Sequence, residues 1–348
     1  MLTRSTHAVL GGLLFGPAVA LAQTLAAAQT STHSEAGEFA VPLPVEVPHK
    51  LARRVALELS GVAWLPRLGR YVLVSDDVTV HHHKHVPQLF TMNEQGRLDA
   101  KPITIDDIDE LNDPESVTLG PDGTLFVCTS HSINAHGRLH ASRSLLLQLE
   151  IGADRRAHIL GQLDLRLARS ATDAPLWPRD APPPGSKSTW GDDATRLDIE
   201  AIAFRDGSLY VGLKAPLTSD GRARILRLSK AVAALANGSI PKGGLSLWST
   251  SRFCVTQAGA NVCEGIADLA FLADGRLLVV ANSPKHALSD GGGSLWELAA
   301  ANAEPKLLQR FPGLKPEGVA LSPNGRAAVI MFDRDGAPPL WARWRLGP

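Results

Sequence analysis

Three glutamates, Glu115, Glu200 and Glu317, occupy the same position in an internal sequence repeat. Each copy of the repeat consists of a short apolar run, a turn and a second apolar run. If equivalent positions of the repeat face a common axis, the three carboxylates repel one another unless a cation or arginines neutralise them. Carboxylate oxygens are the ligands that Ca²⁺ prefers. The spacing therefore predicts a Ca²⁺ site, although glutamates that cap backbone amides, or that meet solvent, would give the same pattern.

Two copies of the repeat lack this glutamate. Ser60 takes the position in the first copy, and Ala267 takes it in the fourth, where Asp268 follows. A second register of the fourth copy is equally possible, because Glu264-Gly-Ile-Ala matches the Glu317-Gly-Val-Ala of the last copy. The candidate metal ligands are therefore Glu115, Glu200, Glu317, Asp268 and, in the second register, Glu264.

A second set of polar residues follows the second apolar run of each copy. The five candidates are Asp76, His131, Lys214, Asn282 and Asp333. Polar residues that differ at one geometrical position are typical of a ligand site built on a rigid scaffold, but also of ordinary surface loops. Lys214 could hold a phosphate or a substrate carboxylate.

The repeats themselves predict the elements that position these side chains. Aligned on the same position, the five copies begin at Ser60, Glu115, Glu200, Ala267 and Glu317. Turns such as Asp206-Gly207 accept the positive φ angles of tight hairpins, and third and fourth apolar runs follow in most copies. This pattern predicts an all-β chain folded as a β-propeller of five blades, and the long interval before the third copy leaves room for a sixth. Residues 53–59 precede the first copy and could close the ring as an N-terminal strand.

The chain divides into three predicted parts. Residues 1–22 have the charged, apolar and small-residue regions of a secretory signal peptide, with cleavage after Ala22. Residues 23–45 read as a disordered leader, and residues 46–348 as one propeller domain with an inserted loop at 169–196 that is rich in Pro, Asp and Ser. We expect a periplasmic or secreted protein with no membrane span in the mature chain.

Composition and motifs exclude several functions. The formal net charge is zero, so the composition does not support nucleic-acid binding. Separately, we expect the protein to be a monomer. The usual motifs of serine hydrolases, zinc proteases and nucleotide-binding enzymes are absent. An acidic run at 106–113 fits an EF-hand poorly, and the histidines of 81–85 could hold Zn²⁺ or simply form a mobile loop.

Export gives the cysteines a structural meaning. Cys254 and Cys263 flank a turn-like insert, and in an oxidising compartment we expect them to form a disulfide. Cys128 lies in an apolar run and is expected to be a buried thiol.

The third copy resembles a bacterial family of exported, propeller-like proteins of unknown function. That family carries Asp-x-Glu-Gly-Leu followed by Gly-Leu-Arg-Gly-Pro, where this chain has Asp198-Ile-Glu-Ala-Ile and Gly212-Leu-Lys-Ala-Pro. Ala201 and Ala215 replace glycines, and Lys214 replaces the arginine. Lysine keeps the charge of an anion-binding arginine but loses its forked geometry.

More distantly the chain is similar to the esterase-like phytase propellers and the SdiA-regulated propellers, through residues 60–64 and 317–319. This resemblance implies a calcium-dependent phosphoesterase or an exported binding protein. We therefore carry two hypotheses. The first is a propeller that holds Ca²⁺ at its channel mouth and binds or hydrolyses a small anionic, phosphoester-type molecule. The second is a non-catalytic propeller that recognises a protein or glycan through its loops.

Overall fold

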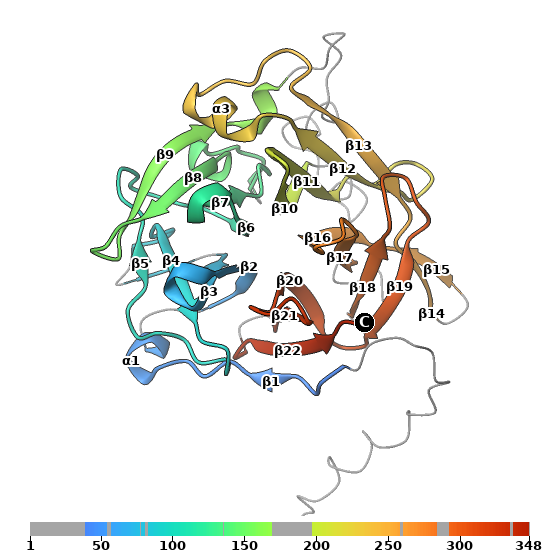
Figure 1. Ribbon diagram of the computed structural model, residues 1–348, viewed down its shortest axis with the longest axis horizontal. Helices are drawn as coiled ribbons and strands as arrows, with labels where there is room; N and C mark the ends of the chain where they lie inside the picture. The colour runs from blue at the N-terminus through green and yellow to red at the C-terminus, as the bar shows by residue number, and fades with distance from the viewer. Residues whose placement is uncertain are drawn as a thin grey trace, which may run out of the picture. The chain divides into compact units, whose positions relative to one another are not determined.

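Five four-stranded antiparallel sheets surround a central axis in the computed structural model of the chain (Figure 1). The structure describes residues 39–53, 57–76, 78–80, 83–134, 136–168, 197–257, 260–283, 292–334 and 337–347, all of which lie in one compact unit, Gly37–Pro348. The arrangement confirms the predicted β-propeller and its five blades. The predicted signal peptide and the inserted loop at 169–196 lie outside the described residues.

Each blade has its first strand nearest the axis and its later strands further out, apart from the fifth blade, whose outermost strand is β1. The first three blades are β2 (Leu59–Leu65), β3 (Arg70–Ser75), β4 (Gln88–Met92), β5 (Ile103–Thr104); β6 (Pro114–Leu119), β7 (Leu125–Thr129), β8 (Leu146–Ile151), β9 (Ala157–Leu163); and β10 (Asp198–Arg205), β11 (Ser208–Ala215), β12 (Ala223–Leu228), β13 (Leu245–Ser251). The last two blades are β16 (Gly265–Phe271), β17 (Leu277–Asn282), β18 (Gly293–Leu298), β19 (Lys306–Phe311); and β20 (Lys315–Leu321), β21 (Ala327–Asp333), β22 (Leu340–Arg345), β1 (Leu43–Pro44).

The ring closes by an N-terminal strand, as predicted, but not by the predicted segment. β1 pairs with β22 in the register Leu43↔Trp341, and Phe39 forms a further bridge to Trp344. Residues 53–59 were the wrong segment, because Leu59 already belongs to the innermost strand of the first blade, where it pairs with Ser75. The strand that completes the last blade must instead lie at the rim beside β22. The end of the predicted leader supplies it, so the fold begins before residue 46.

The hydrophobic core is divided among the five contacts between neighbouring blades. Each of five clusters of buried apolar side chains joins two adjacent sheets. Phe126 and Phe204 meet between the second and third blades, with ring centroids 5.2 Å apart, and Phe311 and Phe332 meet between the last two at the same distance. Because every blade buries both faces against neighbours, the scaffold holds the axis-facing strands firmly.

A one-residue β-bulge near its start distinguishes every innermost strand. The pairing register shifts between Leu59 and Val62, Pro114 and Ser116, Ile199 and Ala201, Ile266 and Asp268, and Pro316 and Gly318. The bulges fall on the aligned position of the sequence repeat, so they settle the fourth copy in favour of Ala267 over Glu264. A bulge bends a strand and re-aims one side chain, and here the re-aimed residues include the three aligned glutamates.

Neighbouring innermost strands approach closely beside the bulges. A Cβ added to Gly61 would lie 2.5 Å from the Cα of Ser116, closer than a carbon side chain tolerates. Glycine in the first copy is therefore required by the packing of blade against blade.

The remaining elements are short. In the part of the chain that the structure describes they are α1 (His49–Ala52), α3 (Ala231–Ala236), four single 3₁₀ turns and a separate hairpin of β14 (Cys254–Gln257) and β15 (Ala260–Cys263). Among the described residues, no helix is both long and apolar enough to span a membrane.

Candidate functional site

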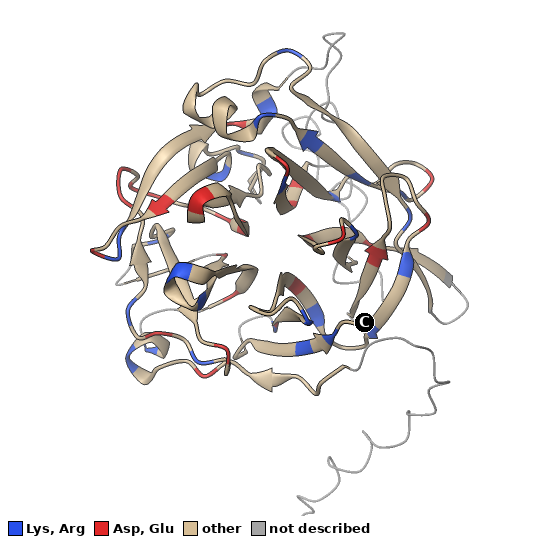
Figure 2. Cartoon of the chain, viewed as in Figure 1, with Lys and Arg blue, Asp and Glu red and all other residues tan. Residues whose placement is uncertain are grey.

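The polar mouth of the channel is formed where the innermost strands begin and the second strands end. Figure 2 shows acidic residues on the strands nearest the axis. Glu200 and Glu317 are nearly buried, with 6% and 5% of their surface exposed, and Glu115 is half-buried. The carboxylates that surround the mouth are Asp76, Asp113, Glu115, Asp198, Glu200, Glu317 and Asp333, and its cations are Arg143, Lys214 and Lys315.

One side of the mouth, which we call the lysine half, contains Glu200, Glu317 and Asp333 with two lysines. Lys214 Nζ lies 2.6 and 2.7 Å from the two carboxylate oxygens of Glu200 and 3.8 Å from Glu317 Oε1. Lys315 contacts the same oxygen of Glu317 and lies 3.2 Å from Asp333 Oδ2. These lysines act as tethered counter-ions of the buried carboxylates, although burial still holds the pKa of Glu200 well above its ordinary value.

The charges of the lysine half stabilise one another despite burial. Burial lowers the pKa of Lys214, but the carboxylates of Glu200 and Glu317 outweigh it and hold the pKa above its ordinary value. Burial likewise raises the pKa of Glu317, and the two lysines overcome that effect and lower the pKa. Asn282 Nδ2 adds a hydrogen bond of 3.1 Å to Glu317 Oε2. Two lysines therefore offset most of the charge of the three carboxylates in this half.

The other side, which we call the acidic half, contains Asp76, Asp113, Glu115 and Asp198. One carboxylate oxygen each from Asp76, Asp113 and Glu115 lies within 4.8 Å of the others. Among the described residues, Arg143 is the cation in contact with this group, and it pairs with Asp113. Three oxygen donors at this spacing match the ligands of a hard divalent cation.

The carboxyl groups of the acidic half are difficult to ionise. Burial, then the charge of Asp113 and a hydrogen bond with it, raises the pKa of Asp76 to about 9. Burial and the charges of Asp113, Glu200 and Asp76 also raise the pKa of Glu115 well above its ordinary value. Burial raises the pKa of Asp198 to about 6. Carboxylates that resist ionisation in this way are relieved by a bound cation, so the residues fit Ca²⁺.

The structure brings most of the predicted ligand residues to the polar mouth. Asp76 lies in the acidic half, while Lys214, Asn282 and Asp333 lie in the lysine half. His131 donates its backbone N–H to Arg143 O, but its side chain has other partners: its Nδ1 lies 2.8 Å from the carbonyl oxygen of Thr129, and its Nε2 accepts a hydrogen bond from Leu165 N. Burial lowers the pKa of His131 to about 4, which suits a neutral structural histidine.

Two predicted metal ligands have other partners. Glu264 is buried against Arg310, 2.8 Å away, and Ser294, on the outer strands of the fourth blade. Asp268 accepts hydrogen bonds from Ser116 Oγ at 2.9 Å and from the backbone N–H of Val319 at 2.8 Å. Its carboxylate therefore joins the second, fourth and fifth blades below the mouth instead of facing a ligand there.

Sequence reasoning missed four residues of the mouth, and three of them share a signal. Asp113, Asp198 and Lys315 each stand two residues before a bulged glutamate, which places them near that glutamate's side of the strand. Arg143 carries no such signal, because it comes from a 3₁₀ turn, Ala141–Arg143, before β8. Of the histidine run, His81 and His82 lie outside the described residues.

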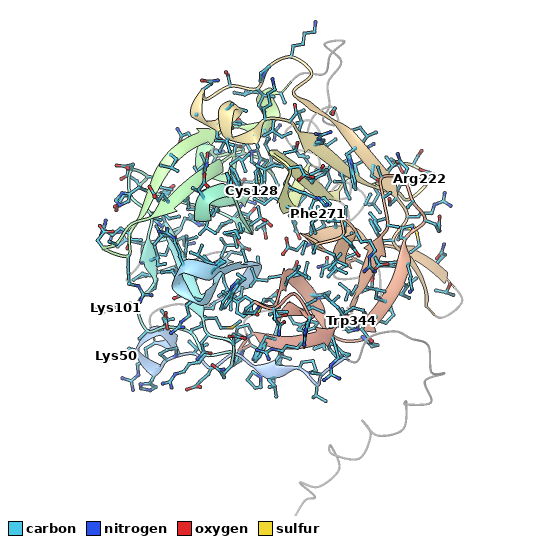
Figure 3. The ribbon with its side chains drawn as sticks, viewed as in Figure 1. Lys50, Lys101, Cys128, Arg222, Phe271 and Trp344 are labelled. Atoms are coloured by element: carbon cyan, nitrogen blue, oxygen red, sulfur yellow. A yellow bond between two sulfur atoms is a disulfide. The ribbon has the colours of Figure 1, made fainter. Side chains whose placement is uncertain are left out.

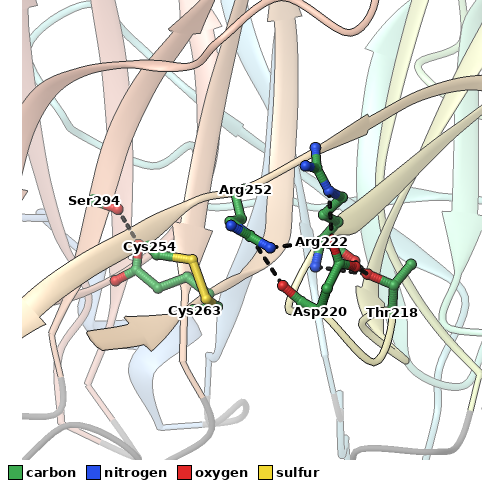
Figure 4. Close-up of a disulfide and its surroundings, with 8 residues drawn as sticks. Thr218, Asp220, Arg222, Arg252, Cys254, Cys263 and Ser294 are labelled. Atoms are coloured by element: carbon green, nitrogen blue, oxygen red, sulfur yellow. Dashed lines mark hydrogen bonds and ion pairs between the residues drawn. A yellow bond between two sulfur atoms is a disulfide. The ribbon is translucent and has the colours of Figure 1, made fainter. Parts of the chain in front are cut away.

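The cysteines behave as predicted. Cys254 and Cys263 form a disulfide across the β14–β15 hairpin (Figure 4), and Cys128 is a buried free thiol. Arg252, next to this hairpin, lies 3.1 Å from Asp220, which Arg222 also contacts at 2.8 Å. The disulfide thus ties down the hairpin that leads into β16.

Solved structures of similar shape share little sequence with this chain. A gluconolactonase from Xanthomonas campestris is 13% identical with a TM-score of 0.40, over 89% of this chain and 98% of its own. A hypothetical protein from Leishmania major is 8% identical with a TM-score of 0.45, over 89% and 91%. A glutaminyl cyclase from Myxococcus xanthus is 13% identical with a TM-score of 0.39, over 89% and 96%. At these scores the likeness carries no argument about activity.

Sequence comparison is more informative. No curated protein matches the chain. Residues 57–331, however, match the phytase-like family, described as having the esterase-like activity of phytase. This match spans all five innermost strands and every residue of the polar mouth except Asp333. The protein therefore belongs to the phytase-like family of propellers, as its more distant sequence resemblance predicted.

Proposed function

We propose that this protein is a Ca²⁺-dependent hydrolase that acts on a small phosphoester at the polar mouth. The observation that carries the proposal is the division of the mouth: three carboxylate oxygens gather within 4.8 Å in the acidic half, and two lysines lie in the lysine half. The family description, which names an esterase-like activity, supports the same class of reaction.

The balance of charge explains why a cation and an anion would bind together. Among the described residues, seven carboxylates surround the mouth with three cationic side chains, so an anion approaching alone would be repelled. Asp76, Asp113 and Glu115 would hold Ca²⁺, which when bound neutralises charge on a phosphoryl oxygen and polarises it. A phosphoester then completes the coordination that the three carboxylates leave open.

The chain's own residues would prepare the site for this ligand. Asp76 retains a proton near neutral pH through its raised pKa, and a bound cation displaces that proton. Lys214 and Lys315 stay charged beside Glu200 and Glu317, which places two ammonium groups where they can attract a second negative group of the substrate. The buried bulges keep these groups in fixed positions, so little reorganisation accompanies binding.

Thermal unfolding with Ca²⁺ and with chelator tests the first step. A ligand that binds only the folded protein raises the melting temperature, so millimolar Ca²⁺ should raise it and EDTA should reverse the rise. Hydrolysis of p-nitrophenyl phosphate should then require Ca²⁺, whereas Mg²⁺, which demands stricter octahedral geometry, should support less. An unchanged melting temperature, together with no Ca²⁺-dependent release of nitrophenol, would refute the proposal.

The predicted export of the protein remains part of this proposal. The Cys254–Cys263 disulfide supports an oxidising compartment, in keeping with a periplasmic or secreted enzyme. Mass spectrometry of the protein from cell fractions would test it, since cleavage after Ala22 should give a mature chain that begins at Gln23.

A further inference from the structure

The opposite end of the channel is apolar. The large residue of each repeated triplet, where the innermost strand leads into its hairpin, forms a ring that we call the apolar mouth: Trp64, Leu119, Phe204, Phe271 and Leu321. All five side chains are half-buried. Phe271, labelled in Figure 3, lies beside the axis, whereas Trp344 lies further out. One large apolar side chain from every blade therefore borders the same opening.

A cavity of about 280 Å³ lies inside this ring. Its walls include the small middle residue of each triplet: Ala63, Thr118, Ala203, Ala270 and Ala320. None of the described residues that line it is ionisable. The combination of large rim residues and small wall residues leaves room at the axis that the chain's own side chains do not fill.

The cavity has a polar floor that separates it from the site at the other mouth. Ser116 and Asp268 come one residue before Val117 and Leu269, which line the cavity. Both are buried, and they are hydrogen-bonded to each other at 2.9 Å. Asp268 also accepts from Val319 N at 2.8 Å, and Ser116 Oγ accepts from Ile202 N at 3.0 Å. These bonds join four of the five blades across the axis, so the cavity is a well with a closed end.

We propose that the apolar mouth is a second binding site, and that it takes a small uncharged apolar molecule such as a single aromatic ring system or a short acyl chain. Apolar cavities of more than about 150 Å³ bind ligands of the size of benzene. Sites for small molecules are concave and lined mainly by apolar and aromatic groups, as this well is. A charged ligand would lose its hydration in the well without gaining a partner.

Fluorescence of N-phenyl-1-naphthylamine, an uncharged probe that brightens in apolar surroundings, tests the site on the full-length protein. Thr118 offers a matched pair of variants, because Val and Asp are both close to Thr in size. Thr118→Val should bind the probe at least as tightly as the unaltered protein. Thr118→Asp should weaken it by at least about tenfold, because an unpaired carboxylate in the wall favours water over an apolar ligand.

Two controls keep the test decisive. Leu247→Asp places the same charge on an exposed leucine of β13, so probe affinity should be unchanged there. Should Thr118→Asp fail to fold, Ala270→Leu, which fills the well with an apolar side chain, should reduce probe affinity instead. Equal affinity in the Thr118→Val and Thr118→Asp proteins, or probe binding that chelator abolishes, would overturn the proposal. The second result would place the probe at the polar mouth, and neither depends on whether phosphoesters are hydrolysed.

Discussion

The lysine half and the acidic half of the polar mouth use the same scaffold in opposite ways. Both rest on glutamates re-aimed by bulges, namely Glu200 and Glu317 on one side and Glu115 on the other. In the lysine half the chain supplies the counter-ions through Lys214 and Lys315. In the acidic half Arg143 pairs with Asp113, while burial and neighbouring carboxylates raise the pKa values of Asp76 and Glu115. The tethered lysines offset most of the charge of one half, whereas the other half gathers carboxylates with fewer cations beside them.

Removing a tethered cation should have the largest effect. Lys214→Met leaves the buried Glu200 carboxylate without its partner, and breaking a buried ion pair from one side costs about 3–5 kcal/mol. Urea unfolding followed by tryptophan fluorescence measures the loss in the free energy of unfolding.

Two further variants serve as controls for this loss. Lys101→Met, at an exposed lysine, should change stability by less than about 0.5 kcal/mol. Lys214→Arg keeps the charge, as in the family with arginine at this position, and should recover most of the stability. If Lys214→Met were as stable as Lys101→Met, the view that the lysine half is held by tethered cations would be wrong.

The second-largest effect should be on Ca²⁺ affinity, which we expect to differ between variants in the two halves. Asp76→Asn removes one charged ligand from the acidic half and should weaken Ca²⁺ by at least about tenfold, because Ca²⁺ sites are tuned by the number of charged ligands. Asp333→Asn removes a carboxylate from the lysine half, where Lys315 occupies it, and should change the affinity by less than about threefold. Isothermal titration calorimetry of both variants gives the answer; equal losses would mean that the cation spans the whole mouth.

Per pH unit, the pH dependence of stability should give the smallest effect. Burial and Asp113 raise the pKa of folded Asp76 from 3.8 to about 9, so between these values the unfolded chain releases a proton that the folded chain keeps. Without Ca²⁺, Asp76 therefore lowers the free energy of unfolding as pH rises through this window, by at most about 1.4 kcal/mol per pH unit. Asp76→Asn should flatten the slope, and saturating Ca²⁺ should do the same. Urea unfolding at pH 6 and pH 8 in EDTA measures this change. A free energy of unfolding that increased from pH 6 to pH 8 would contradict the prediction.

Much of the architecture could be predicted from local pattern. Five aligned repeats with tight turns were enough for five antiparallel blades, because side-chain alternation and turn residues act over a few positions. The disulfide was predicted from the short spacing of Cys254 and Cys263 in a chain that we expect to be exported. The closing strand was misplaced, because nothing in the pattern of residues 53–59 distinguishes a first innermost strand from a last outermost one.

The alignment also predicted that Glu115, Glu200 and Glu317 share a position, since a repeat places equivalent residues around one axis. The partners of the residues around the channel could not be predicted from the sequence. Arg143 reaches Asp113 from 30 residues along the chain, and Asp268 meets Ser116 from 152 residues away. Contacts of that range depend on which blades become neighbours and how far each side chain reaches, so folding alone decides that one half of the mouth receives two lysines and the other gathers three carboxylates.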